Sequence, residues 1–178
     1  MKLSDQLQLV PVQAKDQSIL FQLMETIYKS AYSDFWEDGG DWYLNLIYNP
    51  IQVEKELARS RSHYFFVVWN DQQIGILKYD YPFSPREVAI PNAMKLHRLY
   101  LHEDSHGKGV AKQLLHHCES EAKKANLDFI WLEAMSKKPQ AKRFYEKIGF
   151  ETIFQYRLSF DLLLPQYREI EIMRKRIS

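Results

Sequence analysis

Cysteine, net charge and long hydrophobic runs are all nearly absent from this chain of 178 residues. Its single cysteine, Cys118, cannot form an internal disulfide, so we expect the reducing environment of the cytoplasm. Cys118 follows Leu114 and Leu115 at helical spacing, which indicates a buried packing role. The formal net charge is +1, so the basic excess of a nucleic-acid-binding protein is missing, and no nucleic-acid partner is expected.

The apolar runs, such as Phe65 to Trp69, are too short to cross a bilayer. The start of the chain, Met1 to Asp5, leads into polar sequence and lacks the pattern of a signal peptide. No cluster of His, Cys, Asp or Glu has the spacing of metal ligands. We therefore expect one domain spanning residues 1–178, with no membrane partner and no metal.

Aromatic residues, by contrast, are abundant at 14% of the chain, which suits a core of large side chains or a cleft lined by rings. Hydrophobic periodicity and turn signals predict a mixed order of elements: one strand, helices, three strands, a helix, a strand, a helix and two strands. Pro11 places the first strand at an edge of the sheet, and Asp16 is expected to cap the first helix. The expected strands cover residues 7–12, 63–69, 74–81, 95–101, 129–132, 152–160 and 168–173. The expected helices cover residues 16–32, 42–48, 50–57, 112–125 and 141–149.

A glycine-containing turn joins the strand at 95–101 to the helix that follows it. Its sequence runs from His106 to Ala111, with glycines at 107 and 109. Glycines ahead of a helix let backbone N–H groups approach an anion, and the helix dipole favours negative charge there. Lys108 is followed by Gly109 rather than by Ser or Thr, which excludes a Walker P-loop, and the dinucleotide-binding spacing is missing as well. The turn therefore predicts a phosphate site of another kind.

A second motif lies about thirty residues after the turn. It consists of Ala141, the pair Phe144-Tyr145 and the pair Gly149-Phe150. Together with the turn, this block resembles the GNAT superfamily of acetyl-CoA-dependent N-acetyltransferases, and the order of predicted elements is similar over nearly the whole chain. The resemblance implies an α/β fold with a mixed, mostly antiparallel central sheet, a splayed fourth and fifth strand pair, and flanking helices.

The resemblance also implies where acetyl-CoA, the acyl donor, is bound. Backbone amides of the turn would hold its pyrophosphate, and His106 replaces the usual Gln or Arg. The backbone of the fourth strand would pair with the pantetheine arm, and the N–H of Leu101 would face the thioester oxygen. Lys138 stands where the family usually has an asparagine that touches the cofactor; a solvated lysine without a role is the alternative. The implied cofactor contacts are Leu99, Tyr100, Leu101, His106, Gly107, Lys108, Gly109, Val110, Ala111, Lys112, Lys138 and Phe144.

Two residues are candidates for proton transfer. Tyr145 matches the family tyrosine that protonates the leaving thiolate, and a phenol with a reference pKa near ~10 is protonated at neutral pH. His97 occupies a fourth-strand position where related enzymes often carry a glutamate that accepts the proton of the amine. A histidine that is only packed in the strand, with deprotonation through water, remains the alternative.

The amine acceptor is expected on the first helices. Four carboxylates, at Asp34, Glu37, Asp38 and Asp41, lie among aromatic residues that include Trp36. Carboxylates beside rings suit an organic cation, through ion pairing and cation–π attraction; a solvated acidic loop is the alternative. We assign Asp34, Trp36, Glu37 and Asp38 to acceptor binding.

The function expected from these motifs is direct attack of a primary amine on acetyl-CoA, without an acyl-enzyme. Several stretches are similar to PaiA-type spermidine/spermine N-acetyltransferases, which favours a polyamine or similar small amine. Acetylation of a protein N-terminus or lysine is the second hypothesis. A non-catalytic CoA-binding regulator is an alternative that is not an enzyme. The sequence leaves the acyl chain length and a homodimeric state open.

Overall fold

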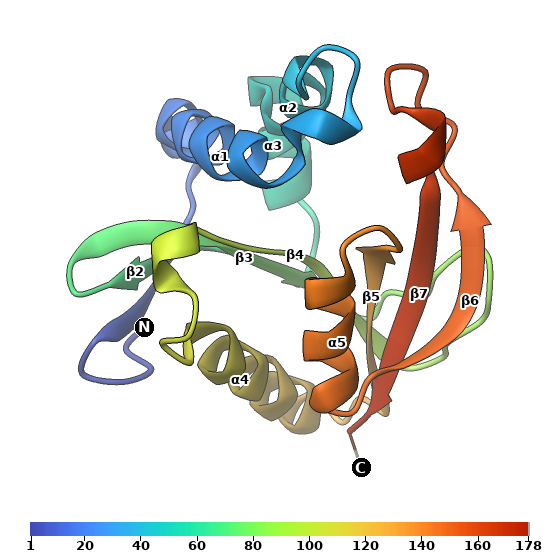
Figure 1. Cartoon of the computed structure of the whole chain (residues 1–178). Helices are drawn as coiled ribbons and strands as arrows, with labels where there is room; N and C mark the ends of the chain where they lie inside the picture. The colour runs from blue at the N-terminus through green and yellow to red at the C-terminus, as the bar shows by residue number, and fades with distance from the viewer. Residues whose placement is uncertain (178) are drawn as a thin grey trace.

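A computed structural model describes residues 1–177 and contains one seven-stranded sheet with helices on both faces (Figure 1). The strands are β1 (Leu7–Pro11), β2 (Ser62–Trp69), β3 (Gln72–Asp80), β4 (Ala93–Leu101), β5 (Phe129–Met135), β6 (Glu151–Arg157) and β7 (Glu169–Arg176). The helices are α1 (Gln17–Tyr32), α2 (Asp41–Tyr48), α3 (Pro50–Leu57), α4 (Val110–Lys124) and α5 (Pro139–Lys147).

The sheet order is β1-β2-β3-β4-β5-β7-β6. Of its neighbouring pairs, only β4 and β5 run parallel, and the other five pairs are antiparallel. The expectation of a mixed, mostly antiparallel sheet is therefore confirmed. β1 lies at an edge with Pro11 as its last residue, where a missing backbone donor is tolerated.

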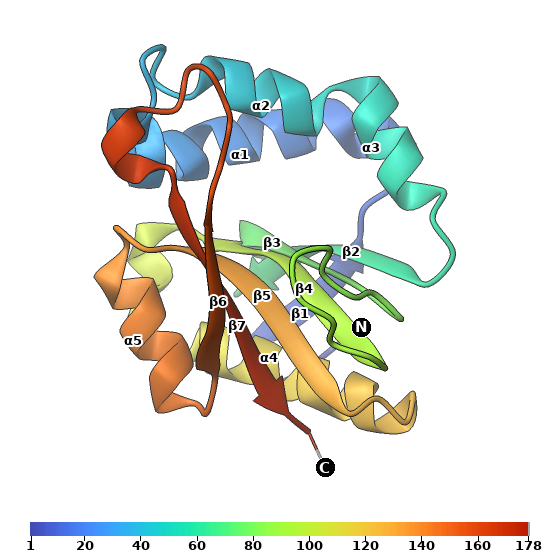
Figure 2. The ribbon, with the colours of Figure 1, turned by 90° about the vertical axis from the view of Figure 1, so that its right-hand side faces the viewer.

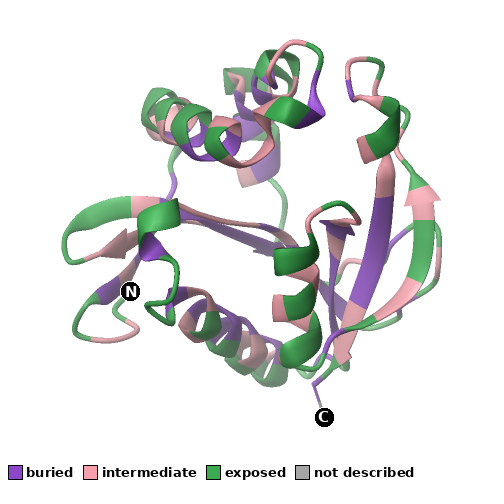
Figure 3. Ribbon diagram, in the orientation of Figure 1, coloured by how far each residue is buried: buried purple, intermediate pink, exposed green. Residues whose placement is uncertain are grey.

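The two faces of the sheet are covered by different helices. Helices α1, α2 and α3 lie over one face, and α4 and α5 lie against the other, as the two views show (Figures 1 and 2). Apolar residues from the helices and the facing strands form a separate core on each side, so the central strands are largely buried (Figure 3). A third, smaller cluster around Trp131 lies beneath the loop between β3 and β4.

Three local expectations need correction. Asp16 stands at the N-cap position of α1, but its carboxylate accepts a hydrogen bond from the N–H of Gln13 at 2.9 Å and does not cap the helix. Asp16 is the last residue of a short 3-10 turn that precedes α1, and its carboxylate caps the start of that turn instead. Helix α4 begins at Val110, two residues earlier than expected, and β7 extends to Arg176. Cys118 is fully buried in the core, as expected.

Within residues 1–177, no helix is both long enough and apolar enough to cross a membrane.

Candidate active site

The site is created by the separation of β4 from β5. The two strands pair only from Ala93 with Phe129 to Leu96 with Leu132. One residue further along β4, the register with β3 shifts, so that His97 is left without a partner between Leu96 and Arg98. An extra residue of this kind bends a strand and interrupts its ladder. The second half of β4 therefore keeps β3 as a neighbour but leaves β5, which confirms the expected splayed pair.

The edge of β4 that faces the gap carries backbone groups available to a ligand. The N–H of His102, just after the strand, donates to the carbonyl of Ile74 in β3 at 2.7 Å. Successive N–H groups of an extended strand point to opposite edges, so the N–H groups of Leu99 and Leu101 point toward the gap. This direction is the one that the predicted contacts with a pantetheine arm and a thioester oxygen require.

A cavity of about 270 Å³ occupies the gap between the two strands. Helices α1 and α2 and the loop between β6 and β7 wall it on one side, and α5 closes it on the other. The side chains that border it are mainly aromatic and aliphatic, with a few polar groups, as is usual for a small-molecule site. The lining includes Tyr28, Tyr32, Trp36, Tyr43, His97, Arg98, Leu99, Tyr100, Glu133, Lys138, Tyr145 and Phe160.

The glycine turn lies at the start of α4. Gly107 and Gly109 both have positive φ angles, +75° and +74°, and a Cβ atom built on either would meet no atom within 4 Å. The first donor within α4 is the N–H of Gln113, which reaches the carbonyl of Gly109 at 3.1 Å. The N–H groups of residues 110–112 consequently have no acceptor within the helix, as at any helix N-terminus. Open space above the glycines and these free donors suit an anion.

Two of the residues predicted to hold the pyrophosphate already use their amides. The N–H of Lys108 donates to the carbonyl of Ser105 at 3.3 Å, and that of His106 donates to Glu103 at 2.9 Å. Both side chains are exposed. Their predicted contact with phosphate therefore depends on the side chains, whereas that of Val110, Ala111 and Lys112 depends on the backbone.

Tyr145 lies on α5 and borders the cavity. Phe150 meets its ring edge to face at 5.6 Å, and Phe144 packs beside it at 5.4 Å. Burial raises the pKa of Tyr145 well above that of a free phenol. No hydrogen bond joins its hydroxyl to another of residues 1–177. The phenol is therefore protonated at neutral pH and free to donate into the cavity.

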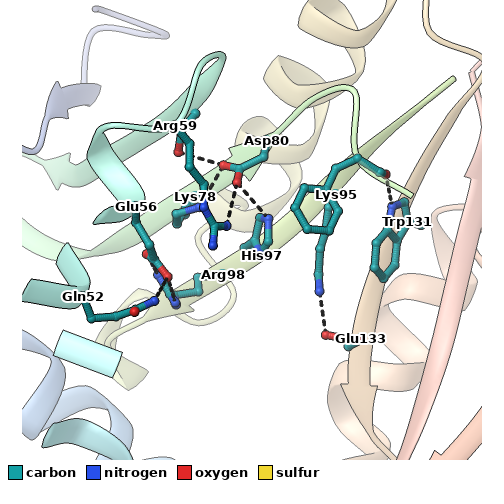
Figure 4. Close-up of polar contacts among 12 residues, drawn as sticks. Gln52, Glu56, Arg59, Lys78, Asp80, Lys95, His97, Arg98, Trp131 and Glu133 are labelled. Carbon is teal, nitrogen blue, oxygen red and sulfur yellow. Dashed lines mark hydrogen bonds and ion pairs between the residues drawn. The ribbon is translucent and has the colours of Figure 1, made fainter. Parts of the chain in front are cut away.

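His97 stands at the bulge, with its Nε2 atom 3.1 Å from Oδ2 of Asp80 (Figure 4). The two atoms are within ion-pair distance, but the contact does not have the geometry of a hydrogen bond. Burial and the nearby ammonium groups of Lys78 and Lys95 lower the pKa of His97 to about 4, although Asp80 opposes them. At neutral pH the imidazole is therefore neutral, and its Nδ1 atom has no hydrogen-bond partner among residues 1–177.

Asp80 is held in place from several sides. Its Oδ1 atom accepts from Ser62 Oγ and from the fully buried Lys78 Nζ, both at 2.8 Å, and Arg59 lies 3.5 Å from Oδ2. These cations and His97 hold the pKa of Asp80 well below its usual range, against the effect of burial. Asp80 is therefore a buried anion that lies beside the Nε2 atom of the His97 imidazole (Figure 4).

A second buried ion pair supports β4 next to the bulge. Arg98 donates to Glu56 of α3 through Nη1 at 2.6 Å and Nη2 at 2.8 Å, a bidentate geometry (Figure 4). The guanidinium also lies over the rings of Tyr48 and Tyr64 at 5.5 and 5.7 Å. This pair ties the helices of the acceptor side to the strand that carries the site.

The predicted acceptor residues divide into two groups. Trp36 is buried, lines the cavity and donates from Nε1 to the hydroxyl of Tyr28 at 3.0 Å. Asp34 and Glu37 are exposed on either side of it and do not border the cavity. The carboxylate of Asp38 accepts from the N–H groups of Gly40 and Trp42, so it caps the start of α2.

Lys138 enters the cavity from the start of α5, but its ammonium group does not point toward the glycine turn. It donates to the carbonyl of Ala31 at the end of α1 and lies over the rings of Tyr32 and Phe35, 4.7 and 5.0 Å from their centroids. The structure thus brings Lys138 to the acceptor side, while its predicted contact with the cofactor stays a prediction.

Glu133 is a site residue that the sequence reasoning missed. It is the one carboxylate that lines the cavity among residues 1–177, and 26% of its side chain is exposed. Oε2 accepts from Lys95 Nζ at 2.8 Å (Figure 4). Oε1 accepts from the hydroxyl of Tyr156, also at 2.8 Å. Its position on a strand beside the gap was the available signal, because residues after Leu132 face the cavity once β4 and β5 separate.

Comparison with known proteins decides the family. The sequence profile of the acetyltransferase (GNAT) family matches residues 21–150. The chain belongs to the GNAT acetyltransferase family. A curated relative, an uncharacterized N-acetyltransferase in the pepI 3' region of Lactobacillus delbrueckii subsp. lactis, is 26% identical over 107 residues. That match covers 60% of this chain and 62% of the length of the relative.

Solved structures of GNAT proteins share the fold. The PaiA N-acetyltransferase of Thermoplasma acidophilum, in complex with coenzyme A, matches with a TM-score of 0.73 and 20% identity, over 96% of this chain and 98% of that one. The spermidine N-acetyltransferase of Vibrio cholerae, in complex with CoA and spermine, matches with a TM-score of 0.68 and 18% identity, over 97% and 96%. At these identities the likeness concerns the fold.

Membership of the GNAT family confirms the predicted family, fold class and enzyme class, with acetyl-CoA as the acyl donor of that class. No group of three or more His, Cys, Asp or Glu residues within 1–177 is placed to hold a metal ion. The roles of individual site residues stay predictions.

Proposed function

We propose that this GNAT protein transfers the acetyl group of acetyl-CoA to a primary amine by direct attack, and that the acceptor is a polyamine such as spermidine. The observation that carries the proposal is the cavity at the gap between β4 and β5, which brings Tyr145, His97 and Glu133 together at an open strand edge. The cavity thus combines a strand edge that could bind the acyl donor, a candidate acid and groups that attract an amine.

The residues divide the chemistry as follows. The N–H of Leu101 stabilises the oxyanion as the amine nitrogen bonds to the carbonyl carbon. As the carbon–sulfur bond breaks, the Tyr145 hydroxyl gives its proton to the thiolate. Nδ1 of the neutral His97, directly or through water, takes the proton that the amine loses.

An amine acceptor is supported by the charge and ring content of the cavity wall. A free alkylammonium has a pKa near ~10.4, so the acceptor arrives as a cation. Glu133 supplies a carboxylate, and Tyr28, Tyr32, Trp36, Tyr43 and Phe160 supply ring faces that attract such a cation.

The polyamine is the finer part of the proposal. The exposed carboxylates of Asp34 and Glu37 flank Trp36, so a long polycation that enters past Trp36 would meet negative charge outside the cavity. The structural neighbours named for spermidine acetylation agree with this choice.

The test is thiol release from acetyl-CoA by the purified protein with spermidine, n-butylamine and a peptide with a free N-terminus and one lysine, each product being identified by mass spectrometry. We expect acetylated spermidine and stoichiometric free thiol. Turnover with the peptide but with neither amine would contradict the polyamine proposal and indicate a protein acceptor. Absence of turnover with every amine, although acetyl-CoA binds, would favour a CoA-binding regulator.

A further inference from the structure

The ammonium group of Lys138 is surrounded by a carbonyl and two aromatic rings, which are groups that attract a cation. It donates to the carbonyl of Ala31, in the last turn of α1. The last carbonyls of a helix have no partner within the helix and lie at the negative end of its dipole. The rings of Tyr32 and Phe35 complete the site at 4.7 and 5.0 Å, within the distance of a cation–π contact.

This cage, formed by the carbonyl of Ala31 and the rings of Tyr32 and Phe35, is held in position by contacts that do not involve Lys138. Tyr32 and Phe35 meet edge to face at 5.4 Å, and Tyr167 stacks on Phe35 at 3.9 Å, so both rings are fixed. Phe35 is also tied to the loop between β6 and β7, because its carbonyl accepts from the N–H of Leu164 at 2.9 Å.

No carboxylate accounts for the position of Lys138. Among residues 1–177, none lies within ion-pair distance of its ammonium group. The cage therefore holds a primary alkylammonium through a carbonyl and two rings alone. It also borders the cavity that contains Tyr145, since Tyr32 and Lys138 both line it.

We propose that this cage is the subsite for an ammonium group of the acceptor, and that Lys138 occupies it as an internal stand-in that the acceptor must displace. The inference rests on the proposed function, an amine acetyltransferase. The reacting amine must be neutral when it attacks, so the cage holds a second, non-reacting ammonium. The acceptor class that follows is a linear amine with at least two nitrogens.

The test compares Lys138→Met with Lys137→Met. Lys137 is the exposed neighbour, so the second variant removes the same charge but leaves the cage occupied. The end of a lysine side chain is an n-butylammonium group, which makes n-butylammonium chloride the matching probe. Calorimetry should show about tenfold tighter binding of this probe to Lys138→Met than to the parent, and no change for Lys137→Met.

Kinetics supply the second readout. The KM for spermidine should fall about tenfold in Lys138→Met and should stay at the parent value in Lys137→Met. Lys138→Arg, which keeps a cation in the cage, should behave as the parent does. Unchanged or weaker binding of n-butylammonium by Lys138→Met overturns the inference, and so does tighter binding without a lower KM for spermidine.

The two proposals can fail separately. If neither the parent nor the variant acetylates any amine while the variant binds n-butylammonium more tightly, the acetyltransferase proposal fails and the cage is a cation site of another function. If the parent acetylates spermidine and the variant shows no gain in binding or in KM, the enzyme stands and the cage is only a structural contact. Removal of one ring by Tyr32→Leu in the Lys138→Met background should reverse the gain.

Discussion

The Nε2 atom of His97 lies 3.1 Å from Oδ2 of Asp80, at the bulge residue that the β3–β4 register skips between Leu96 and Arg98. The contact joins the feature that opens the site, the bulge, to a buried anion held by Lys78 and Ser62. The bulge thus both separates β4 from β5 and turns an imidazole toward Asp80.

This environment predicts how stability depends on pH. The pKa of His97 is lowered from 6.5 to about 4 in the folded protein. Between these two pH values the imidazole is therefore protonated in the unfolded chain and neutral in the folded one. Stability from this group is complete above pH 6.5 and is lost as the pH falls toward 4, by up to about 3 kcal/mol. Urea unfolding of the parent and of His97→Gln between pH 7 and 4 should show a shallower loss for the variant. Parallel pH profiles would contradict the burial of a neutral imidazole.

The ion pair between Glu56 and Arg98 should be costly to break. Glu56→Ala leaves the guanidinium buried without its partner, and the removal of one member of a buried pair typically costs about 3–5 kcal/mol. The free energy of unfolding, measured with urea at pH 7, should fall by that amount. Glu54→Ala, an exposed glutamate on the same helix, is the control and should cost much less. Equal losses in the two variants would show that the pair adds nothing beyond helix propensity.

The phosphate site can be tested at Gly109. A valine there enters the open space above the turn, where an anion would meet the backbone. Acetyl-CoA affinity, measured by calorimetry, should fall by about tenfold or more. Gly39→Val is a matched control, because Gly39 has a similar φ of +70° and equally open surroundings but lies away from α4. The control should bind acetyl-CoA as the parent does. Similar losses of affinity in both variants would show that backbone strain, and not a blocked phosphate site, causes the effect.

The polyamine proposal makes a prediction about the exposed carboxylates. Asp34→Asn combined with Glu37→Gln should raise the KM for spermidine and leave that for acetyl-CoA unchanged. Asp38 is left intact because it caps α2. The difference between parent and variant should shrink with added salt, since exposed charges are screened beyond about 10 Å at ~0.1 M. An unchanged KM would make these residues an ordinary solvated surface.

Much of the fold and part of the site followed from the sequence, because both depend on local patterns. The glycine turn and the block around Tyr145 predicted the family and the splayed strands. No local pattern indicated that Asp80 lies beside His97, since that contact depends on the register between β3 and β4.

Tertiary contacts also explain the remaining differences. Glu133 became visible as a site residue only once the gap was placed. The cage around Lys138 joins residues more than one hundred positions apart in the chain, so no local pattern could reveal it.

The central claim, that the gap between β4 and β5 performs acetyl transfer with Tyr145 as the acid, is tested most directly by Tyr145→Phe. This change removes one hydroxyl and little packing. Turnover with the best amine should fall by roughly 10²–10⁴-fold, the usual contribution of a positioned acid, while calorimetry shows nearly the same affinity for acetyl-CoA. A variant that binds acetyl-CoA normally and retains nearly full turnover would contradict the account.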